Sequence, residues 1–326
     1  MTDPAAAYAD IRDEISTVLV GNDELIERFT ISLLTGGHVL VEGVPGVAKT
    51  TAANVFARSV GLDFTRIQMT PDILPADITG THVYRESTGE FDLERGPVFS
   101  NLVVADEINR ATPKTQSALL EAMEEGNVTI EGETLTLPQP FMVIATQNPI
   151  EMEGTFELPE AQRDRFQFKL TVEIPERTDE RTIIDRFDEN ATLGPDDISQ
   201  VLSTDDILAL RETVRTVHVA DPVKEYLLDV VEAIRASTYV EAGASPRASL
   251  AFLHAGKARA AIHGRDYVIP ADITELVEPI LSHRLVLSTD ASLSDLATED
   301  VLTEALEEVP PPSQLDAEAL SATSNS

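Results

Sequence analysis

Short apolar runs alternate with other stretches along the first half of the chain. Runs rich in β-branched and other apolar residues predict buried strands, because a strand covered on both faces needs no polar side. These runs lie at 38–41, 64–68, 102–107, 141–149 and 168–172. The stretches before and between them predict helices at 5–19, 23–35, 51–58, 113–125 and 158–166. Strands alternating with helices through residue 174 predict an α/β domain with a parallel sheet.

After residue 176 the apolar spacing is helical throughout. Helices are predicted at 177–188, 204–217, 221–238, 246–263 and 270–285. We therefore expect an α/β core over 1–176 and a smaller all-α lid domain over 177–300. The last segment, 301–326, is rich in Glu, Ala and Ser and holds three consecutive prolines, so a disordered acidic tail is predicted there.

Two segments interrupt the regular alternation in the first half. Residues 70–98 are broken by prolines and stand between two predicted core strands, so we interpret them as a functional insert with room for one short helix. Residues 127–138 hold two alternating runs around a glycine, which predicts a β-hairpin.

A glycine-rich turn joins the first strand to the next helix. Backbone N–H groups of such a turn converge on an anion, and the helix start adds partial positive charge. Lys49 would reach the β- and γ-phosphates of a nucleotide, and the Thr50 hydroxyl would ligate Mg²⁺. An ordinary strand–turn–helix corner is the alternative. The predicted nucleotide-binding residues are Gly43, Val44, Pro45, Gly46, Val47, Ala48, Lys49, Thr50 and Thr51.

Two carboxylates close the strand predicted at 102–107. In a parallel sheet the carboxyl ends of the strands meet the ligand. Asp106 would hold Mg²⁺ together with Thr50, and Glu107 would orient and polarise the attacking water. An acidic helix N-terminus following a strand is the alternative interpretation. The position some 60 residues after the phosphate loop favours the catalytic one.

Polar residues elsewhere are candidates for contacts with the phosphates. Asn148 ends the strand at 141–149, where it could position water or contact the γ-phosphate, or simply start a turn. Arg163 and Arg165 share a short helix and could form a plain ion-pair network. Arg247 stands at a helix start, where a cation is disfavoured, so it suggests a bound phosphate or a surface ion pair with a nearby Glu.

Composition excludes some classes of protein. The sequence has no cysteine, which removes disulfides and thiolate chemistry. The first ten residues lack a secretory pattern and no run approaches the length of a membrane span, so we expect a soluble cytoplasmic protein. The net charge is −33, with acids spread along the whole chain, which favours adaptation to molar salt over an acidic binding surface. A net-negative surface also argues against binding duplex DNA.

The motifs together resemble the MoxR family of AAA+ ATPases over about residues 8–290. The motifs are LVEGVPGVAKT at 40–50, ADEINRA at 105–111, ATQNP at 145–149 and LPEAQ at 158–162. The alanine at position 48 is usual in this family. The resemblance implies ATP and Mg²⁺ as ligands, a ring that is normally a hexamer, and chaperone action on partner proteins, often ones with von Willebrand factor A domains.

The resemblance also implies roles for single residues. Lys49 and Thr50 correspond to the Walker A residues, Asp106 and Glu107 to the Walker B pair, and Asn148 to sensor 1. Arg165 corresponds to an arginine finger acting on the neighbouring subunit's ATP, with Arg163 as the other candidate. Arg247 corresponds to sensor 2, which the lid would swing in. The insert at 70–98 and the hairpin at 127–138 would face the pore or the substrate.

We therefore expect an ATP-hydrolysing AAA+ chaperone, with ATP bound where the α/β core meets the lid. A nucleic-acid motor is one alternative, but the sequence lacks basic stripes and an appended DNA-binding domain. A scaffold that binds ATP without turnover is another, and the set of Glu107, Asn148 and Arg165 argues against it. Stimulation of the ATPase by DNA in high salt would distinguish the motor.

The acidic composition gives a first prediction, about salt. At about 0.1 M salt the Debye length is near 10 Å, so like charges repel across the surface, whereas at about 1 M they are screened within about 3 Å. We expect the melting temperature to fall, or the assembly to dissociate, as the salt is lowered from molar to 0.1 M. An equal melting temperature in both buffers would show that the acids serve another purpose.

Overall fold

A five-stranded parallel sheet forms the centre of the computed structural model, which describes residues 3–44, 46–47, 49–87, 89–148 and 154–312. Its strand order is β2-β5-β8-β1-β9, and the pairing is parallel throughout. The strands are β1 (Val39–Gly43), β2 (Phe64–Gln68), β5 (Leu102–Asp106), β8 (Met142–Gln147) and β9 (Phe168–Val172). The parallel α/β fold predicted from the sequence is confirmed.

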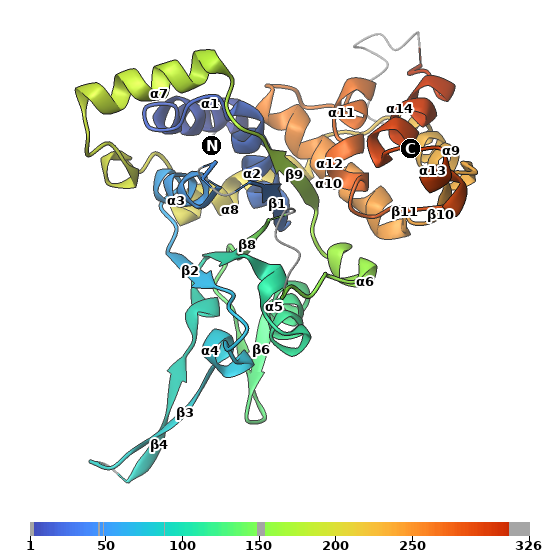
Figure 1. Cartoon of the computed structure of the whole chain (residues 1–326). Helices are drawn as coiled ribbons and strands as arrows, with labels where there is room; N and C mark the ends of the chain where they lie inside the picture. Colours follow the sequence, from blue (N-terminus) through green and yellow to red (C-terminus); the bar gives the residue numbers. More distant parts are fainter. Residues whose placement is uncertain (1–2, 45, 48, 88, 149–153, 313–326) are drawn as a thin grey trace.

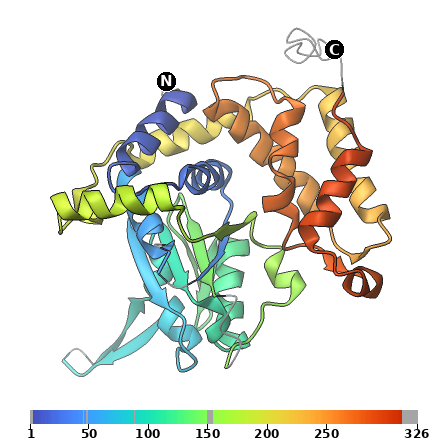
Figure 2. The same ribbon diagram turned by 45° about the horizontal axis from the view of Figure 1, so that its top comes forward.

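The two faces of the sheet are covered by different helices (Figures 1 and 2). Val39 and Val41 belong to one buried cluster, while Leu40 between them belongs to the other, because successive side chains of a strand point to opposite faces. The first cluster includes side chains of α1 (Pro4–Ile15), α2 (Asp23–Thr35) and α3 (Lys49–Ser59). The second includes those of α5 (Pro113–Glu125). The sheet is therefore the middle of three layers.

The insert differs from its prediction. It holds the expected short helix, α4 (Pro75–Thr79), but also an antiparallel hairpin of β3 (Gly80–Arg85) and β4 (Glu90–Arg95) that projects from the body (Figure 1). Two glycines stand at the base of this hairpin, where the backbones approach closely. A Cβ on one of them, Gly80, would lie 2.3 Å from the Glu94 carbonyl oxygen. The predicted hairpin at 127–138 is confirmed as β6 (Asn127–Ile130) and β7 (Glu133–Thr136).

The second half is helical, as predicted. Its elements are α7 (Arg177–Glu189), α8 (Thr204–Arg215), α9 (Asp221–Ala236), α10 (Pro246–Ile262), α11 (Pro270–Thr274), α12 (Val277–Leu281), α13 (Thr289–Leu293) and α14 (Thr298–Glu308), with the small hairpin β10 (Val240–Ala242) and β11 (Val286–Leu287). Short α6 (Glu160–Arg163) precedes β9, and single 3₁₀ turns are η1 (Pro97–Phe99), η2 (Ile108–Arg110) and η3 (Pro195–Asp197).

Three expectations need correction. The boundary at 176 does not separate two cores, since α8 packs on α2 and the lid helices share one buried cluster with the sheet. The helix predicted at 270–285 is broken, because Pro279 has no N–H for the Glu275 carbonyl, which instead accepts from Arg28. The tail expected from 301 is ordered helix to Glu308, with Val301 buried. The remainder of that tail, 313–326, lies outside the described residues.

The helices carry no membrane-spanning candidate. Within the described ranges, every helix is too short or too polar to cross a bilayer. The cytoplasmic location stays a prediction.

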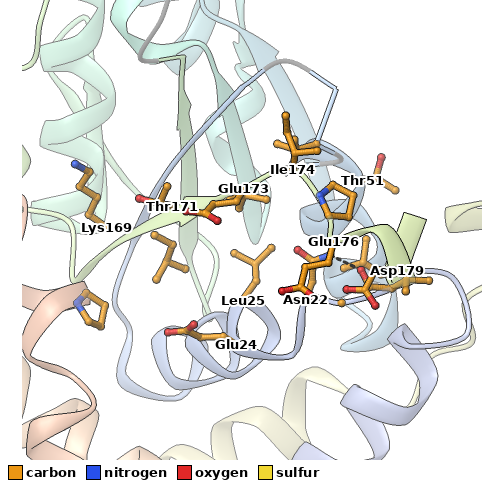
Figure 3. Close-up of a pocket in the computed structure, with 18 of the residues that line it drawn as sticks. Asn22, Glu24, Leu25, Thr51, Lys169, Thr171, Glu173, Ile174, Glu176 and Asp179 are labelled. Carbon is orange, nitrogen blue, oxygen red and sulfur yellow. Dashed lines mark hydrogen bonds between the residues drawn. The ribbon is translucent and has the colours of Figure 1, made fainter. Parts of the chain in front are cut away.

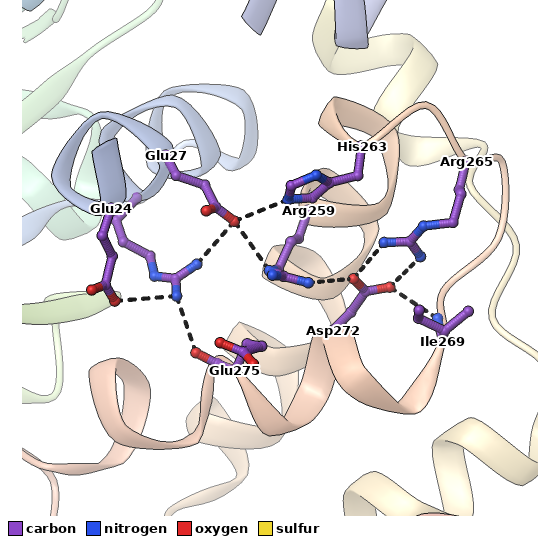
Figure 4. A network of polar contacts seen from close by, with 9 residues as sticks. Glu24, Glu27, Arg259, His263, Arg265, Ile269, Asp272 and Glu275 are labelled. Atoms are coloured by element: carbon purple, nitrogen blue, oxygen red, sulfur yellow. Dashed lines mark hydrogen bonds and ion pairs between the residues drawn. The ribbon is translucent and has the colours of Figure 1, made fainter. Parts of the chain in front are cut away.

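A network of buried charges joins α2 to the lid helices α10 and α11 (Figure 4). Asp272 is fully buried and accepts from Arg259 at 2.8 Å and from Arg265 at 2.6 and 2.7 Å. Arg259 also pairs with Glu27 at 3.0 Å, and Glu27 pairs with the buried Arg28 at 3.2 Å. Because every charge here has a partner of opposite sign, the free-energy cost of removing these groups from water is offset by their attraction.

This network gives the second prediction. Asp272→Asn removes the charge that two arginines share, and breaking a buried ion pair from one side costs about 3–5 kcal/mol of unfolding free energy. Denaturant unfolding measures the loss. The exposed Asp229 on α9 gives a matched control, because Asp229→Asn removes the same charge from the surface and should change little. A loss below about 1 kcal/mol for Asp272→Asn would contradict the role of the network.

Candidate functional site

The phosphate loop follows β1 at the carboxyl edge of the sheet. Gly43 lies so close to β9 that a Cβ there would be 2.5 Å from the Val172 carbonyl oxygen, and Gly46 has a positive φ of 90°. The helix α3 begins at Lys49, so its first backbone N–H groups face the loop. Pro45 and Ala48, which were predicted to bind nucleotide, lie outside the described residues.

The side chain of Lys49 folds back onto the phosphate loop. Its ammonium group donates to the carbonyl oxygens of Gly43 and Val44, the latter at 3.2 Å. Burial lowers the pKa of Lys49, while the carboxylates of Asp106 and Glu107 oppose that change. The lysine is thus held among loop carbonyls, with the carboxylates of Asp106 and Glu107 at the end of β5 close enough to affect it.

Asp106 ends β5 and is a buried residue, 8% exposed. One oxygen accepts from the Thr146 hydroxyl at 2.5 Å, and the other from Arg66, whose Nε lies 3.1 Å away. The Thr50 hydroxyl lies 3.5 Å from that second oxygen. The two residues predicted to ligate a metal are therefore brought together, although one is on α3 and the other on β5.

Glu107 leaves the strand in an unusual conformation. Its φ is 57°, a left-handed value that is rare for residues other than glycine and turns the side chain from the strand direction. The backbone N–H donates to the Thr146 hydroxyl at 3.0 Å. The carboxylate accepts from Gln68 at 2.8 Å and pairs with Arg110 at 3.4 Å. Glu107 is thereby aimed across the edge of the sheet rather than along the strand.

Asn148 completes the arrangement at this edge. It follows β8, which lies between β1 and β5, and it is buried. The register aligns Glu42 with Gln147, so Asn148 stands beside the start of the phosphate loop. The sheet therefore places Asn148 between the loop and the two carboxylates, as the pattern of strand ends predicts.

A cavity of about 1070 Å³ opens beside the loop, between the first layer of helices and the lid (Figure 3). Gly46 and Thr51 line it on the loop side, and Asn22 and Leu25 at the start of α2 line it opposite. Lid residues on α12 and α14 also reach it. The cavity thus lies where the core meets the lid. Acidic side chains line it as well: Glu24, Glu173, Glu176, Asp179, Glu275, Glu278 and Glu299.

Arg165 and Arg247 lie near the amino ends of the strands, opposite the carboxyl ends where the phosphate loop stands. Arg165 precedes β9, whose Phe168 is paired with Val39 at the start of β1. A five-residue strand separates that edge from the loop by roughly 16 Å. Glu124 pairs with both arginines, with Arg165 at 2.9 Å and with Arg247 at 2.6 Å. In this structure Arg247 pairs with Glu124 and not with the phosphate loop of its own chain, and its role as sensor 2 stays a prediction.

Comparison with known proteins agrees with this geometry. Residues 38–168 match the ATPase family associated with various cellular activities (AAA), and 232–305 match an AAA lid domain. Chaperone MoxR1 of Mycobacterium tuberculosis is 48% identical, with 91% of this chain and 80% of that protein covered. The chain belongs to the MoxR family of AAA+ ATPases.

Further relatives are similar over nearly the whole chain. YeaC of Bacillus subtilis is 44% identical, covering 94% of this chain and 95% of its own. Protein MoxR of Methylorubrum extorquens is 32% identical, covering 88% and 90%. A crystal structure from Cytophaga hutchinsonii, provisionally described as an ATPase, superimposes with a TM-score of 0.88 at 39% identity and covers 95% of this chain and 96% of its own.

The sequence analysis missed several residues of this MoxR-family site. Arg66 and Gln68 on β2 and Thr146 on β8 contact the two carboxylates, and none was predicted. A signal was available for Gln68 and Thr146, because both lie near the carboxyl ends of the strands on either side of β5, where a parallel sheet gathers its site.

The oxygen donors around Asp106 fit a magnesium ion. Hydroxyl and carboxylate oxygens are the ligands that Mg²⁺ takes, together with waters and substrate phosphates. Among the residues that the structure describes, no three acidic or histidine side chains gather into a metal site of their own. Thr50 and Asp106 would therefore share the ion with phosphate oxygens, which is how Mg²⁺ is usually held beside a nucleotide.

Proposed function

We propose that this chain binds ATP with Mg²⁺ in the phosphate loop and hydrolyses it to ADP and phosphate. The observation that carries the proposal is the convergence of Thr50, Asp106, Glu107 and Asn148 on the loop from different elements. Phosphoryl transfer needs little covalent help from the protein, so positioned charges and one water-orienting group suffice. The adjoining cavity of about 1070 Å³ is large enough for a base and ribose.

The loop residues would bind the triphosphate. Phosphate oxygens are stronger acceptors than the carbonyls of Gly43 and Val44, so the Lys49 ammonium would exchange those partners for the β- and γ-phosphates. Thr50 and Asp106 would hold Mg²⁺, which neutralises charge between the β- and γ-phosphates. Arg66 contacts the same oxygen of Asp106, so it has to move when that oxygen takes a metal.

Glu107 would orient the water that attacks the γ-phosphate. Its left-handed backbone aims the carboxylate across the strand ends, and Gln68 and Arg110 hold it there. These contacts restrict the side chain before substrate arrives, which lowers the entropic cost of reaching the reactive geometry. Asn148 would hold the γ-phosphate or the water from the side of β8.

We infer that hydrolysis requires a ring of subunits. Arg165 and Arg247 lie at the edge opposite the loop, so neither can serve the nucleotide of its own chain without a large movement. In a head-to-tail contact, the edge that carries the two arginines would lie against the acidic cavity of the next copy. Repeated contacts of that kind close into a ring. The number of six subunits rests on resemblance to the family.

We further propose that the ring acts as a chaperone on partner proteins. A relative that is 48% identical bears the name Chaperone MoxR1. The hairpins at 80–95 and 127–136 would contact the client, since the first projects from the body (Figure 1). Clients with von Willebrand factor A domains are proposed from the family resemblance alone.

The third prediction tests ATP binding. Lys49→Ala removes the cation that would face the β- and γ-phosphates, so calorimetry should detect no ATP binding. The melting temperature should stay near that of the wild type, because Lys49 bonds only to loop carbonyls among the contacts described. Lys114→Ala, an exposed lysine on α5, is the matched control. Equal ATP affinity in wild type and Lys49→Ala would refute the assignment.

The fourth prediction tests hydrolysis. Glu107→Gln keeps the size and the contact with Gln68 but removes the charge that polarises water. ATP should bind as before, and turnover should fall by roughly 10²–10⁴, the usual contribution of a positioned base. Steady-state phosphate release measures it. Turnover within about twofold of the wild type would contradict the role of Glu107 and favour the alternative, a scaffold that binds ATP without hydrolysing it.

The fifth prediction tests the action of Arg165 across a subunit boundary. An arginine acting on a neighbouring phosphate contributes on the order of 10³–10⁵ in rate. Rings of Arg165→Ala should bind ATP and fail to hydrolyse it. Mixed with Lys49→Ala subunits, which keep the arginine but bind no ATP, they should regain partial activity. Mixtures that co-assemble yet stay inactive would reject the role and make Arg163 the next candidate.

A further inference from the structure

Glu124 joins two arginines that come from distant parts of the chain. One carboxylate oxygen lies 2.9 Å from Arg165 Nη2, and the other lies 2.6 Å from Arg247 Nη2. Arg165 belongs to the segment before β9, whereas Arg247 is the second residue of the lid helix α10. The sequence analysis left open an ion pair of Arg247 with a nearby Glu, and that acid is Glu124, which follows Met123 near the end of α5.

A buried histidine holds the backbone next to Glu124. His38 stands just before β1 and is buried. Its Nδ1 accepts from the Val143 N–H at 3.0 Å, so the proton is on Nε2, which donates to the Met123 carbonyl at 3.1 Å. Burial lowers the pKa of His38 to about 4, which keeps this pattern at neutral pH. The end of α5 is therefore tied to the amino edge of the sheet.

The backbone around Arg165 is held just as firmly, but by the lid. Arg284, nearly buried, donates to the Phe166 carbonyl at 2.7 Å and pairs with Asp164 at 2.8 Å. His283 contacts the same Phe166 carbonyl at 3.0 Å. Beside Arg247, the Ser245 hydroxyl donates to Asp164 at 3.3 Å. Both arginines thus extend from one fixed piece of structure, and their side chains meet at Glu124.

The charges explain why a carboxylate is needed at this point. Two guanidinium groups close together repel each other, and each oxygen of Glu124 takes one of them. The hydrogen bond from Arg247, followed by the charge of Arg165, lowers the pKa of Glu124, so it stays ionised. One positive charge remains beside a cavity of about 250 Å³ that Glu124, Arg165 and Arg247 line. An anionic group brought by another molecule could enter there.

We propose that Glu124 is a positioning residue, which holds Arg165 and Arg247 side by side so that the triphosphate of a second copy of this chain meets both cations at once. The inference rests on the proposed function, in which these arginines act on the neighbouring subunit. Ion pairs that are partly exposed add little to stability. The side chain of Glu124 is 33% exposed and that of Arg247 is 54% exposed, so the pairing orients more than it stabilises.

Rings assembled from two variants distinguish a failure of the positioning role of Glu124 from a failure of the proposed function. In a mixture of Arg165→Ala and Lys49→Ala subunits, the Lys49→Ala subunits donate the arginines and the others bind ATP. We place Glu124→Gln on the donating subunit. Misplacing the arginines by about 1 Å can cost up to 10²-fold, so kcat of the mixture should fall about tenfold. KM for ATP should not change, because the receiving subunit keeps its own nucleotide site.

Glu124→Gln placed on the receiving subunit instead is the matched control. This subunit already lacks Arg165, and its Arg247 faces a neighbour without ATP, so adding Glu124→Gln there should leave the mixture as active as before. Glu125→Gln on the donating subunit removes an adjacent charge outside the pair and should also leave it as active. Glu124→Asp, which keeps the charge on a shorter side chain, should restore part of the rate. All mixtures are compared at one salt concentration, because ion pairs are screened by salt.

The outcomes are distinct. If the parent mixture shows no complementation despite co-assembly, the proposed function fails. If it complements and Glu124→Gln on the donor changes kcat by less than about twofold, or raises it, the positioning role fails alone. A fall of equal size from either subunit type would also overturn it, since that is the pattern of lost folding or assembly. Melting temperatures within about 3 °C of the parent support positioning rather than stability.

Discussion

The carboxylate of Asp106 is the contact on which the site depends. It ends β5 in a nearly dry position and takes donors from β2, from β8 and from the side of α3. Thr146 donates to Asp106 and accepts from the Glu107 N–H, so one hydroxyl fixes both acids. A charged group this buried needs its partners, because an unpaired buried charge costs free energy, and these partners reach it only while the strands stay in register. The parallel pairing of the sheet and the chemistry of the site therefore require each other.

Much of this could be read from the sequence, because parallel strands have a strong signal. Runs of apolar residues mark strands buried on both faces, and their carboxyl ends must gather at one edge. The loop around Lys49, the pair at Asp106 and Glu107, and Asn148 all stand at such ends, so their proximity was predictable. The roles of these residues stay predictions. Their proximity determines which side chains can contact the phosphates, but it does not determine which reaction follows.

The features that were missed depend on contacts between distant segments. Nothing local tells that Arg66 faces Asp106, because strand order and not sequence order makes them neighbours. The meeting of Arg247 with Glu124 depends on where the lid packs, which periodicity cannot give. Pro279 was visible as a helix breaker but was outweighed by the apolar spacing around it. The hairpin at 80–95 lacks a buried face, so its alternation was weak.

The lid and the sheet share one continuous apolar cluster, which runs from strands β1 and β8 through α2 to α10 and α12. A hinge needs a plane along which two bodies can slide or open, and close-packed interiors resist such motion because each displaced side chain loses its neighbours. Opening the lid away from the sheet would therefore expose apolar side chains along the whole of this cluster, from the strands to α12.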